Sequence, residues 1–230
     1  MIELNNLSLS FENWKLNANL LVGPEKFSFL IGPSGAGKSS ILNAIAGFLP
    51  HGPNEVLING QDMKGLGPEQ RPVSMLFQEN NLFNHLTILQ NTGLGIDPNL
   101  NLNPKDWQRV EAALERVGLE GMGERLPRDL SGGQRQRAGL ARIMLRQKPV
   151  MLLDEPFAAL GPALRKDMLD LVKSLAQEAK QTVIMVTHQP DDARHAADLV
   201  AFVSEGTIQQ AGSTQSVLDN PNAGLKSYLG

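Results

Sequence analysis

A glycine-rich segment of this chain has the composition of a loop that binds phosphate groups. It lies between an apolar run at 27–31 and a predicted helix at 38–46, and it consists of Gly32, Pro33, Ser34, Gly35, Ala36, Gly37, Lys38, Ser39 and Ser40. Glycines let successive backbone N–H groups turn toward phosphate oxygens, and the N-terminus of the following helix favours an anion. The Lys38 ammonium can reach the β and γ phosphates of a nucleotide, and the Ser39 hydroxyl can ligate Mg²⁺.

Two adjacent carboxylates, Asp154 and Glu155, directly follow a continuously apolar run at 150–153. Such a run is typical of a strand buried on both faces, so both acids are expected at one edge of a sheet. Beside a phosphate-binding loop, Asp154 is placed to serve Mg²⁺, and Glu155 is placed to polarise a water for in-line attack on the γ-phosphate. An acidic pair can also cap the next helix. The phosphate-binding loop upstream favours the catalytic interpretation.

A second glycine-containing segment precedes another predicted helix, from about Gln134 to Arg146. The segment consists of Leu130, Ser131, Gly132, Gly133 and Gln134. It predicts a second anion site, to which the Ser131 hydroxyl adds a donor. One nucleotide does not need two such segments from one subunit. In a homodimer, however, each nucleotide can lie between the first segment of one subunit and the second segment of its partner.

The order of these motifs along the whole chain resembles that of the ABC ATPase family. The phosphate-binding loop comes first, then Gln78, the 130–134 segment, the acidic pair, and finally His188 after another apolar run. The resemblance implies hydrolysis of ATP with Mg²⁺, by a P-loop NTPase (RecA-like) α/β core with an antiparallel β edge subdomain and an inserted α-helical subdomain. A P-loop kinase or GTPase is unlike this chain, because of the 130–134 segment and His188.

The same resemblance assigns roles to three further residues. Gln78 is implied to contact the metal and the attacking water and to sense a membrane subunit. His188 is implied to contact the γ-phosphate; a histidine in such a place is more often a strand-end residue with no catalytic role, but its position in this order of motifs favours the catalytic role. Phe11 is implied to stack on adenine, and Trp14 is the nearby alternative for that role. Phe11 could instead be an aromatic residue of the hydrophobic core, with no contact to the nucleotide.

One position departs from the family pattern. The family usually has Ser-Ala-Leu-Asp after the catalytic glutamate, whereas this chain has Ala158-Ala159-Leu160-Gly161. The missing aspartate helps to align the facing phosphate-binding loop, so its absence predicts weaker coupling across the dimer. Gly161 followed by Pro162 still suits the start of a helix.

The loop at 71–87 and the residues up to 103 resemble those of ATPases that energise bacterial thiamine importers. Iron(III), sulfate and polyamine importers share part of the pattern. The resemblance implies a membrane permease that docks near residues 78–100, a periplasmic substrate-binding protein reached through it, and a peripheral location on the cytoplasmic face of the inner membrane. The solute is expected to be thiamine or its phosphates. A soluble, non-transport ABC ATPase is the alternative from another class.

The elements that must position these residues alternate between apolar runs and helical patterns, which predicts a largely parallel sheet. Strands are expected at 27–31, 56–58, 73–77, 150–153, 182–186 and 199–203. Gly47 is expected to end the helix at 38–46. The first 25 residues alternate polar and apolar side chains with no helix between them, as expected for an antiparallel edge.

The middle of the chain, from about 79 to 146, shows helices and loops but no convincing strand. Asn103 and Pro104 form a good helix start, and Gly118 is a plausible stop. We therefore predict one ABC ATPase domain over residues 1–230, with an α/β core at 1–78 and 147–230 and a helical subdomain at 79–146.

The composition of the whole chain excludes several classes of site. The 230 residues include no cysteine, which removes disulfides, thiolate metal sites and a cysteine nucleophile. A net charge of −3 argues against binding nucleic acid over the whole surface. No apolar run approaches the roughly 18 residues of a membrane helix, and the N-terminus lacks a basic start, so no signal peptide is expected.

Overall fold

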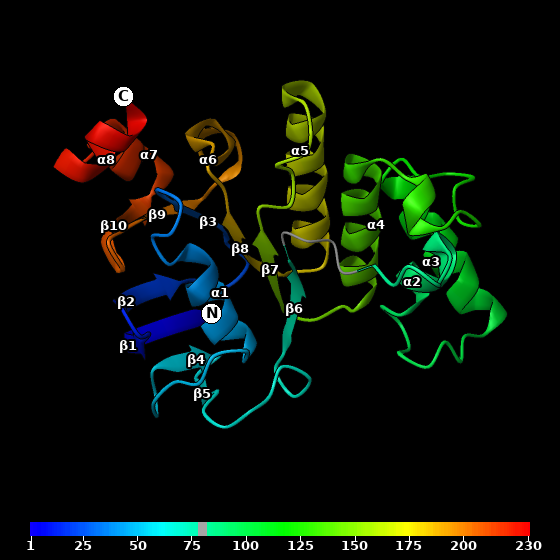
Figure 1. Ribbon diagram of the computed structural model, residues 1–230, viewed down its shortest axis with the longest axis horizontal. Coiled ribbons are helices and arrows are strands. Elements are labelled where there is room, and N and C mark those ends of the chain that lie inside the picture. The colour runs from blue at the N-terminus through cyan, green and yellow to red at the C-terminus, as the bar shows by residue number, and fades with distance from the viewer. Residues whose placement is uncertain (78–81) are drawn as a thin grey trace.

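The fold of the chain is a single twisted sheet with helices on both faces and a helical lobe at one end (Figure 1). This computed structural model describes residues 1–77 and 82–230. The strands are β1 (Ile2–Ser10), β2 (Lys15–Val22), β3 (Phe27–Ile31), β4 (Val56–Ile58), β5 (Gln61–Asp62), β6 (Val73–Leu76), β7 (Val150–Asp154), β8 (Thr182–Val186), β9 (Leu199–Ser204) and β10 (Thr207–Ser213).

The sheet has a parallel half and a mostly antiparallel half. Within the described residues its order is β5-β4-β1-β2-β10-β9-β3-β8-β7-β6. From β9 to β6 all neighbours are parallel, so the carboxyl ends of β3, β7 and β8 meet at one edge. The antiparallel pairing of β1 with β2 and β4 confirms the prediction for the first 25 residues.

Helices cover both faces of the sheet, and a group of them forms the lobe. They are α1 (Lys38–Ala46), α2 (Ile88–Gly93), α3 (Pro104–Arg116), α4 (Gly132–Leu145), α5 (Pro162–Glu178), α6 (Pro190–Ala196), α7 (Thr214–Asp219) and α8 (Ala223–Leu229), with a 3₁₀ turn at Pro127–Asp129. Within the described residues, no helix is both long and apolar enough to span a bilayer.

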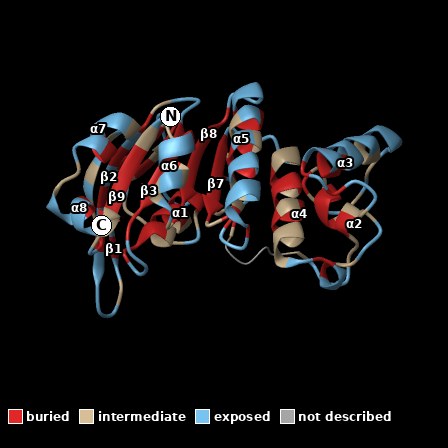
Figure 2. Ribbon diagram, turned by 90° about the horizontal axis from the view of Figure 1, so that it is seen from above, coloured by how far each residue is buried: buried red, intermediate tan, exposed pale blue. Residues whose placement is uncertain are grey.

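The central strands are buried on both faces, which creates two hydrophobic cores. In β7, Met151 and Leu153 pack into the core beneath α5 and α6, while Val150 and Leu152 pack into the core beneath α1. Strands β3, β7 and β8 have five residues each, and every one of these residues is buried, as their continuous apolar runs predict. Figure 2 shows the buried residues concentrated in these strands, with exposed residues on the outer side of α5.

Helix α1 is held against the sheet at its C-terminal end. Gly47 has a φ of 94° and donates to the carbonyls of the last turn, which confirms the predicted stop. The buried Arg71 guanidinium donates to the carbonyl oxygens of Ala44 and Ile45 at 2.7 and 2.9 Å. A cation there also complements the negative end of the helix dipole, so α1 is fixed where it leaves the phosphate-binding loop.

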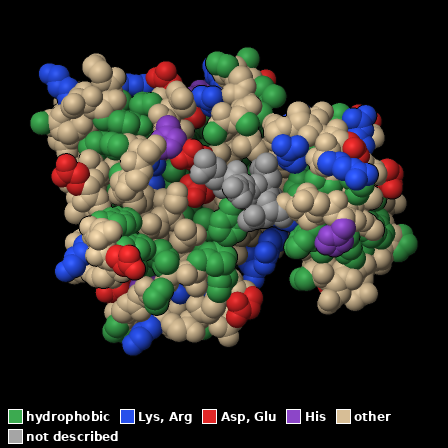
Figure 3. Space-filling view, in the orientation of Figure 1, with side chains coloured by type: hydrophobic (Ala, Val, Ile, Leu, Met, Phe, Trp, Pro, Cys, Tyr) green, Lys and Arg blue, Asp and Glu red, His purple; other side chains and the backbone are tan. Residues whose placement is uncertain are grey.

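Helices α2, α3 and α4 form a separate lobe beyond β6, visible as a distinct mass in Figure 3. No strand occurs among residues 82–146, as predicted. Asn103 caps α3 through a capping box with Asp106, with Pro104 at the first position. The predicted boundary between residues 78 and 79 lies outside the described residues.

Inside this lobe, Asn91 is a fully buried hydrogen-bonding centre in α2. Its side-chain amide donates to the carbonyl oxygens of Phe83, Leu86 and Thr87, each at 3.0 Å. Its carbonyl oxygen accepts from the Phe83 N–H at 2.7 Å. The exposed loop before α2 is therefore tied to the helix by one side chain.

Four predicted bounds need correction. Helix α4 begins at Gly132 and not near Gln134, because Ser131 caps it and forms a capping box with Gln134. The two glycines are thus the first residues of the helix and not a loop before it. Strand β6 ends one residue before its predicted end at 77. Strands β7 and β9 each end one residue after their predicted ends at 153 and 203.

Candidate active site

The phosphate-binding loop begins at Gly32, where the carboxyl end of β3 approaches β9 very closely. Gly32 has a φ of 145°, and a Cβ atom there would lie 1.9 Å from the Val203 carbonyl oxygen. Gly37, which precedes α1, has a φ of 102°. Only glycine accommodates this close approach and these dihedral angles, so the sequence of the loop follows from its conformation.

Lys38 lies buried at the start of α1, with 4% of its surface exposed. Its ammonium group donates to the carbonyl oxygens of Gly32 and Pro33 at 2.8 and 2.7 Å. Burial lowers the pKa of Lys38, while the nearby Glu155 and Asp154 carboxylates act in the opposite direction. The loop thus holds a desolvated cation close to the two carboxylates of the acidic pair.

Ser39 and Asp154 bring hard oxygen atoms together beside Lys38. The Ser39 hydroxyl donates to Asp154 Oδ1 at 3.0 Å. Burial is the main cause that raises the pKa of Asp154, partly offset by the bond from Ser39 and the charge of Lys38. A hydroxyl and a partly desolvated carboxylate are the kind of ligands that Mg²⁺ takes in proteins, so these residues fit the predicted metal site.

The His188 imidazole contacts the Glu155 carboxylate at the ends of β7 and β8. Glu155 has a φ of 48°, a left-handed conformation that is uncommon for a residue with a side chain. Its backbone N–H donates to the Val186 carbonyl oxygen at 3.1 Å, so the neighbouring strand supports this conformation. Backbone strain of this kind concentrates at functional sites.

A cavity of about 320 Å³ joins the predicted residues of one subunit. It is lined by Trp14, Ser34, Gly35, Gly37, Lys38, Ser39, Ser40, Glu155 and His188. The structure therefore brings together the loop, the candidate base and the candidate γ-phosphate histidine, although they come from distant parts of the sequence. Asp154 joins them through its bond with Ser39.

The aromatic side of this cavity is Trp14 and not Phe11. The two rings are stacked, with centroids 4.5 Å apart and planes 6° from parallel. Trp14 lines the cavity beside Gly37, whereas Phe11 is not among the lining residues and packs partly against the core. Of the two alternatives for contact with a base, this arrangement favours Trp14, because Phe11 lies on the far side of the stack.

The structure does not bring the 130–134 segment to the cavity of its own chain. None of its residues is among those that line the cavity in the described part of the chain. Ser131 and Gln134 bond each other's backbone N–H groups, at 3.3 and 2.8 Å. Gly132 and Gly133 occupy the first two helical positions, where backbone N–H groups have no intrahelical partner and can receive an anion from elsewhere.

Gly161, the position that departs from the family pattern, is the N-cap of α5. Its φ is −65° and its ψ is 159°, angles that any residue adopts. A Cβ atom at Gly161 would have no neighbour within 4 Å. Neither the backbone conformation nor packing requires glycine at this position.

The predicted residue Gln78 lies outside the described residues. One residue without any signal in the sequence also lies near the site: Tyr228, the single tyrosine, donates from its hydroxyl to the His188 carbonyl oxygen at 3.1 Å.

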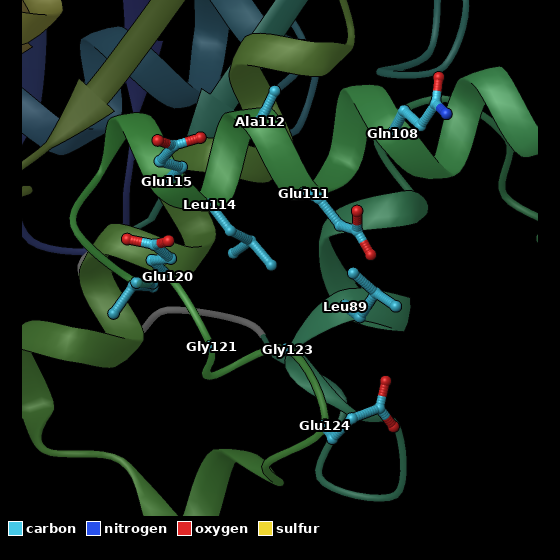
Figure 4. Close-up of a pocket in the computed structure, with 11 residues that line it drawn as sticks. Leu89, Gln108, Glu111, Ala112, Leu114, Glu115, Glu120, Gly121, Gly123 and Glu124 are labelled. Carbon is cyan, nitrogen blue, oxygen red and sulfur yellow. The ribbon is translucent and has the colours of Figure 1, made fainter.

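A separate cavity of about 480 Å³ lies in the helical lobe, between α3 and the 119–124 loop (Figure 4). Four glutamates surround apolar side chains that include Leu89 and Leu114. The glutamates are Glu111, Glu115, Glu120 and Glu124. This cavity contains no residue of the predicted catalytic set.

Comparison with known proteins identifies the family to which the chain is similar. The sequence profile of the ABC transporter family matches residues 16–158, more than half of the chain. The thiamine import ATP-binding protein ThiQ of a Ruegeria species is 51% identical over 230 residues, covering 100% of both chains. That of Photobacterium profundum is 50% identical, covering 95% of this chain and 91% of its own.

Solved structures give the same result. The ATP-binding cassette MJ0796, in a dimeric post-hydrolysis state bound to ADP and Pi, aligns with a TM-score of 0.83 and 27% identity, covering 93% of this chain and 99% of its own. Another dimeric structure of that bacterial transporter cassette aligns with a TM-score of 0.82 and 28% identity. The agreement of sequence, fold and site geometry shows that this chain belongs to the ABC transporter family.

Proposed function

We propose that this chain is the ATP-hydrolysing subunit of a membrane importer for thiamine or its phosphates. The observation that carries the ATPase assignment is the meeting of two pairs, Ser39 with Asp154 and Glu155 with His188, at the phosphate-binding loop. Thiamine is supported by relatives at about half identity over the full length, which are named as thiamine import ATP-binding proteins.

Each side chain has a defined task in the proposed reaction. Lys38 binds the β and γ phosphates, for which its ammonium must leave the carbonyl oxygens of Gly32 and Pro33. Glu155 orients and polarises the attacking water, and His188 contacts the γ-phosphate and holds Glu155. Ser39 and Asp154, with Gln78, would hold Mg²⁺, which supplies positive charge where the phosphate oxygens become more negative.

Two copies of the chain are proposed to enclose two ATP molecules. The 130–134 segment does not line the cavity of its own chain, yet the first turn of α4 has the free N–H groups of an anion site. A facing subunit would supply these groups to the γ-phosphate. The dimeric state named for the solved cassette relatives supports this arrangement.

The permease is proposed to dock near residues 78–100, on the cytoplasmic face of the inner membrane, and to receive its solute from a periplasmic binding protein. Phe83 lies in this region with half of its surface exposed. An exposed aromatic on a loop tied to a helix is the kind of anchor that protein interfaces use. Residues 78–100 include no lysine or arginine, which supports a protein partner and not a nucleic acid.

The test is reconstitution of this chain with the proposed partner permease and the periplasmic binding protein in lipid vesicles. Thiamine should stimulate ATP hydrolysis and accumulate inside vesicles oriented for uptake, and iron(III), sulfate and spermidine should not. Lys38→Ala in the same complex should remove both activities, because it removes the charge that binds the β and γ phosphates. Stimulation by another of these solutes but not by thiamine would overturn the solute assignment and leave the ATPase assignment intact.

A further inference from the structure

The last helix of the sequence, α8, is fastened to the sheet close to the candidate active site. Asn222 caps it by accepting from the Leu225 N–H at 2.8 Å, and the Asn222 N–H itself donates to the Gln210 side chain in β10 at 2.9 Å. Leu225 is fully buried in the core beneath α5 and α6. Figure 1 shows α7 and α8 together at the upper left, near β10. These contacts within the protein fix helix α8, and none of them depends on nucleotide.

From this fixed helix, Tyr228 reaches the loop that carries His188. Its hydroxyl donates to the His188 carbonyl oxygen at 3.1 Å, and its ring lies against Phe202, with centroids 5.7 Å apart. Burial raises the pKa of Tyr228, so the hydroxyl keeps the proton that it donates.

The bond from Tyr228 adds an anchor from another part of the chain to the His188 loop. Before His188, the Thr187 N–H donates to the Leu30 carbonyl oxygen at 3.3 Å, and the Thr187 hydroxyl donates to Asp192 at 2.9 Å. These bonds fix the strand end and the start of α6. The peptide unit that follows His188 is held at both ends: its Gln189 N–H donates to the Thr187 hydroxyl at 3.1 Å, and its His188 carbonyl oxygen accepts from Tyr228. The bond from Tyr228 therefore limits the movement of the backbone that carries the imidazole.

We propose that Tyr228 is a positioning residue for hydrolysis: its hydroxyl holds the backbone carbonyl of His188 and so helps to keep the imidazole against Glu155. This inference rests on the proposed role of His188. Tyr228 touches neither nucleotide nor water in this scheme. It acts through His188, so its loss should affect turnover more than nucleotide binding.

The experiment compares Tyr228→Phe with Ser227→Ala in the reconstituted complex. Phenylalanine keeps the ring against Phe202 and removes only the hydroxyl, while Ser227 is an exposed hydroxyl on the same helix. We expect Tyr228→Phe to lower kcat roughly fivefold, the effect of one lost hydrogen bond, with little change in KM for ATP. Ser227→Ala should leave both constants unchanged. Unchanged kcat in Tyr228→Phe overturns the inference.

A double-mutant cycle with His188→Ala separates this inference from the proposed function. If Tyr228 acts through His188, adding Tyr228→Phe to His188→Ala should not lower the residual single-turnover rate further. An additive loss would show an effect that bypasses His188 and would refute the positioning role. If His188→Ala alone keeps normal turnover, the proposed role of His188 fails. If His188→Ala is slow while Tyr228→Phe is normal, only the positioning inference fails.

Imidazole NMR signals of His188 that shift in Tyr228→Phe but not in Ser227→Ala support the proposal directly.

Discussion

The Ser39 hydroxyl donates a hydrogen bond to Asp154 Oδ1 across 3.0 Å, although 115 residues separate the two in sequence. This bond joins the first turn of α1 to the carboxyl end of β7, so it fixes the phosphate-binding loop relative to the acidic pair. It also stabilises a carboxylate that burial disfavours. The protein thus keeps a charged group in a place that is unfavourable for stability and suited to a metal.

Asp154→Asn should therefore separate stability from activity. Asparagine can still accept from Ser39 but carries no charge, so we expect Mg²⁺-dependent ATPase activity to fall roughly 100-fold or more. Because folding raises the pKa of Asp154, the folded state binds the proton more tightly than the unfolded chain does. The contribution of the Asp154 carboxyl to the stability of the folded state is thus most favourable below the unfolded pKa of 3.8. This contribution is lost as the pH rises through the higher folded pKa.

At pH 7.5 the variant without nucleotide should consequently have a higher Tm than the natural chain, and this gain should shrink as the pH approaches 4. Thermal denaturation across this pH range, in parallel with ATPase assays, provides the measurement. A lower Tm for Asp154→Asn at pH 7.5 would show that the carboxylate is a net stabilising group and would contradict the argument.

Glu155→Gln should trap the enzyme before hydrolysis. Glutamine keeps the size of the side chain but cannot serve as a base, so turnover should fall by a factor of roughly 10² to 10⁴ while MgATP binding persists. The ATP-bound dimer should then accumulate and be visible by light scattering with ATP but not with ADP. A monomer that hydrolyses ATP at the normal rate would remove both the proposed base and the shared site.

Trp14→Ala should weaken ATP binding more than Phe11→Ala does. Trp14 lines the cavity, while Phe11 supports it from behind through the stacked rings. Loss of stacking on a base corresponds to about 1–3 kcal/mol, or roughly 5- to 150-fold in Kd. Isothermal titration with ATP measures both variants, and Trp107→Ala in α3 serves as the control. A larger loss in Phe11→Ala would reverse the assignment.

Ser131→Arg and Lys38→Ala should each be inactive alone and partly active when mixed. In a mixed dimer, one composite site receives both substitutions and the other receives none, so one intact site returns. Ser131→Arg also removes a helix cap, which costs about 1 kcal/mol, so its Tm must be measured beside its activity. Absence of any recovery in a mixture of two well-folded variants would argue against ATP shared across an interface.

Gly161→Asp tests the departure from the family pattern. The φ of −65° and the open space around Gly161 admit an aspartate without strain, and an acid at the start of α5 is favourable by roughly 0.3–1 kcal/mol. We expect equal or higher Tm and a higher ATPase rate or tighter ATP-dependent dimerisation. Gly161→Asn, which also caps a helix but carries no charge, separates capping from the effect of the carboxylate. If turnover and dimerisation are identical in all three proteins, the coupling argument fails.

The sequence predicts those parts of the fold and the site that local patterns dictate. Strands buried on both faces, such as β3 and β8, are short continuous apolar runs, and Gly47 and Asn103 mark helix ends by their chemistry. Helix α4 begins two residues earlier than the sequence pattern predicts, because paired glycines are typical of loops while the Ser131 capping box makes them helical here.

What the sequence could not predict depends on contacts between distant segments. The choice between Phe11 and Trp14 depends on which ring of the stack faces Gly37, and both rings are equally aromatic in the sequence. Tyr228 carries no local signal, since its role follows from where α8 packs against the His188 loop, 40 residues earlier. Tertiary packing, and not propensity, decides both cases.

The four hydrogen bonds of Asn91 have a mechanical consequence for the loop that precedes α2. A loop held only at its ends would deform under a load and absorb the displacement. Here a load on the Phe83 ring is passed through one rigid amide to the middle of α2, so loop and helix shift as one stiff body. The Phe83 amide should accordingly exchange its hydrogen slowly for a surface loop, and Asn91→Ala should make the loop compliant enough to lose the stimulus from a docked permease while keeping basal hydrolysis.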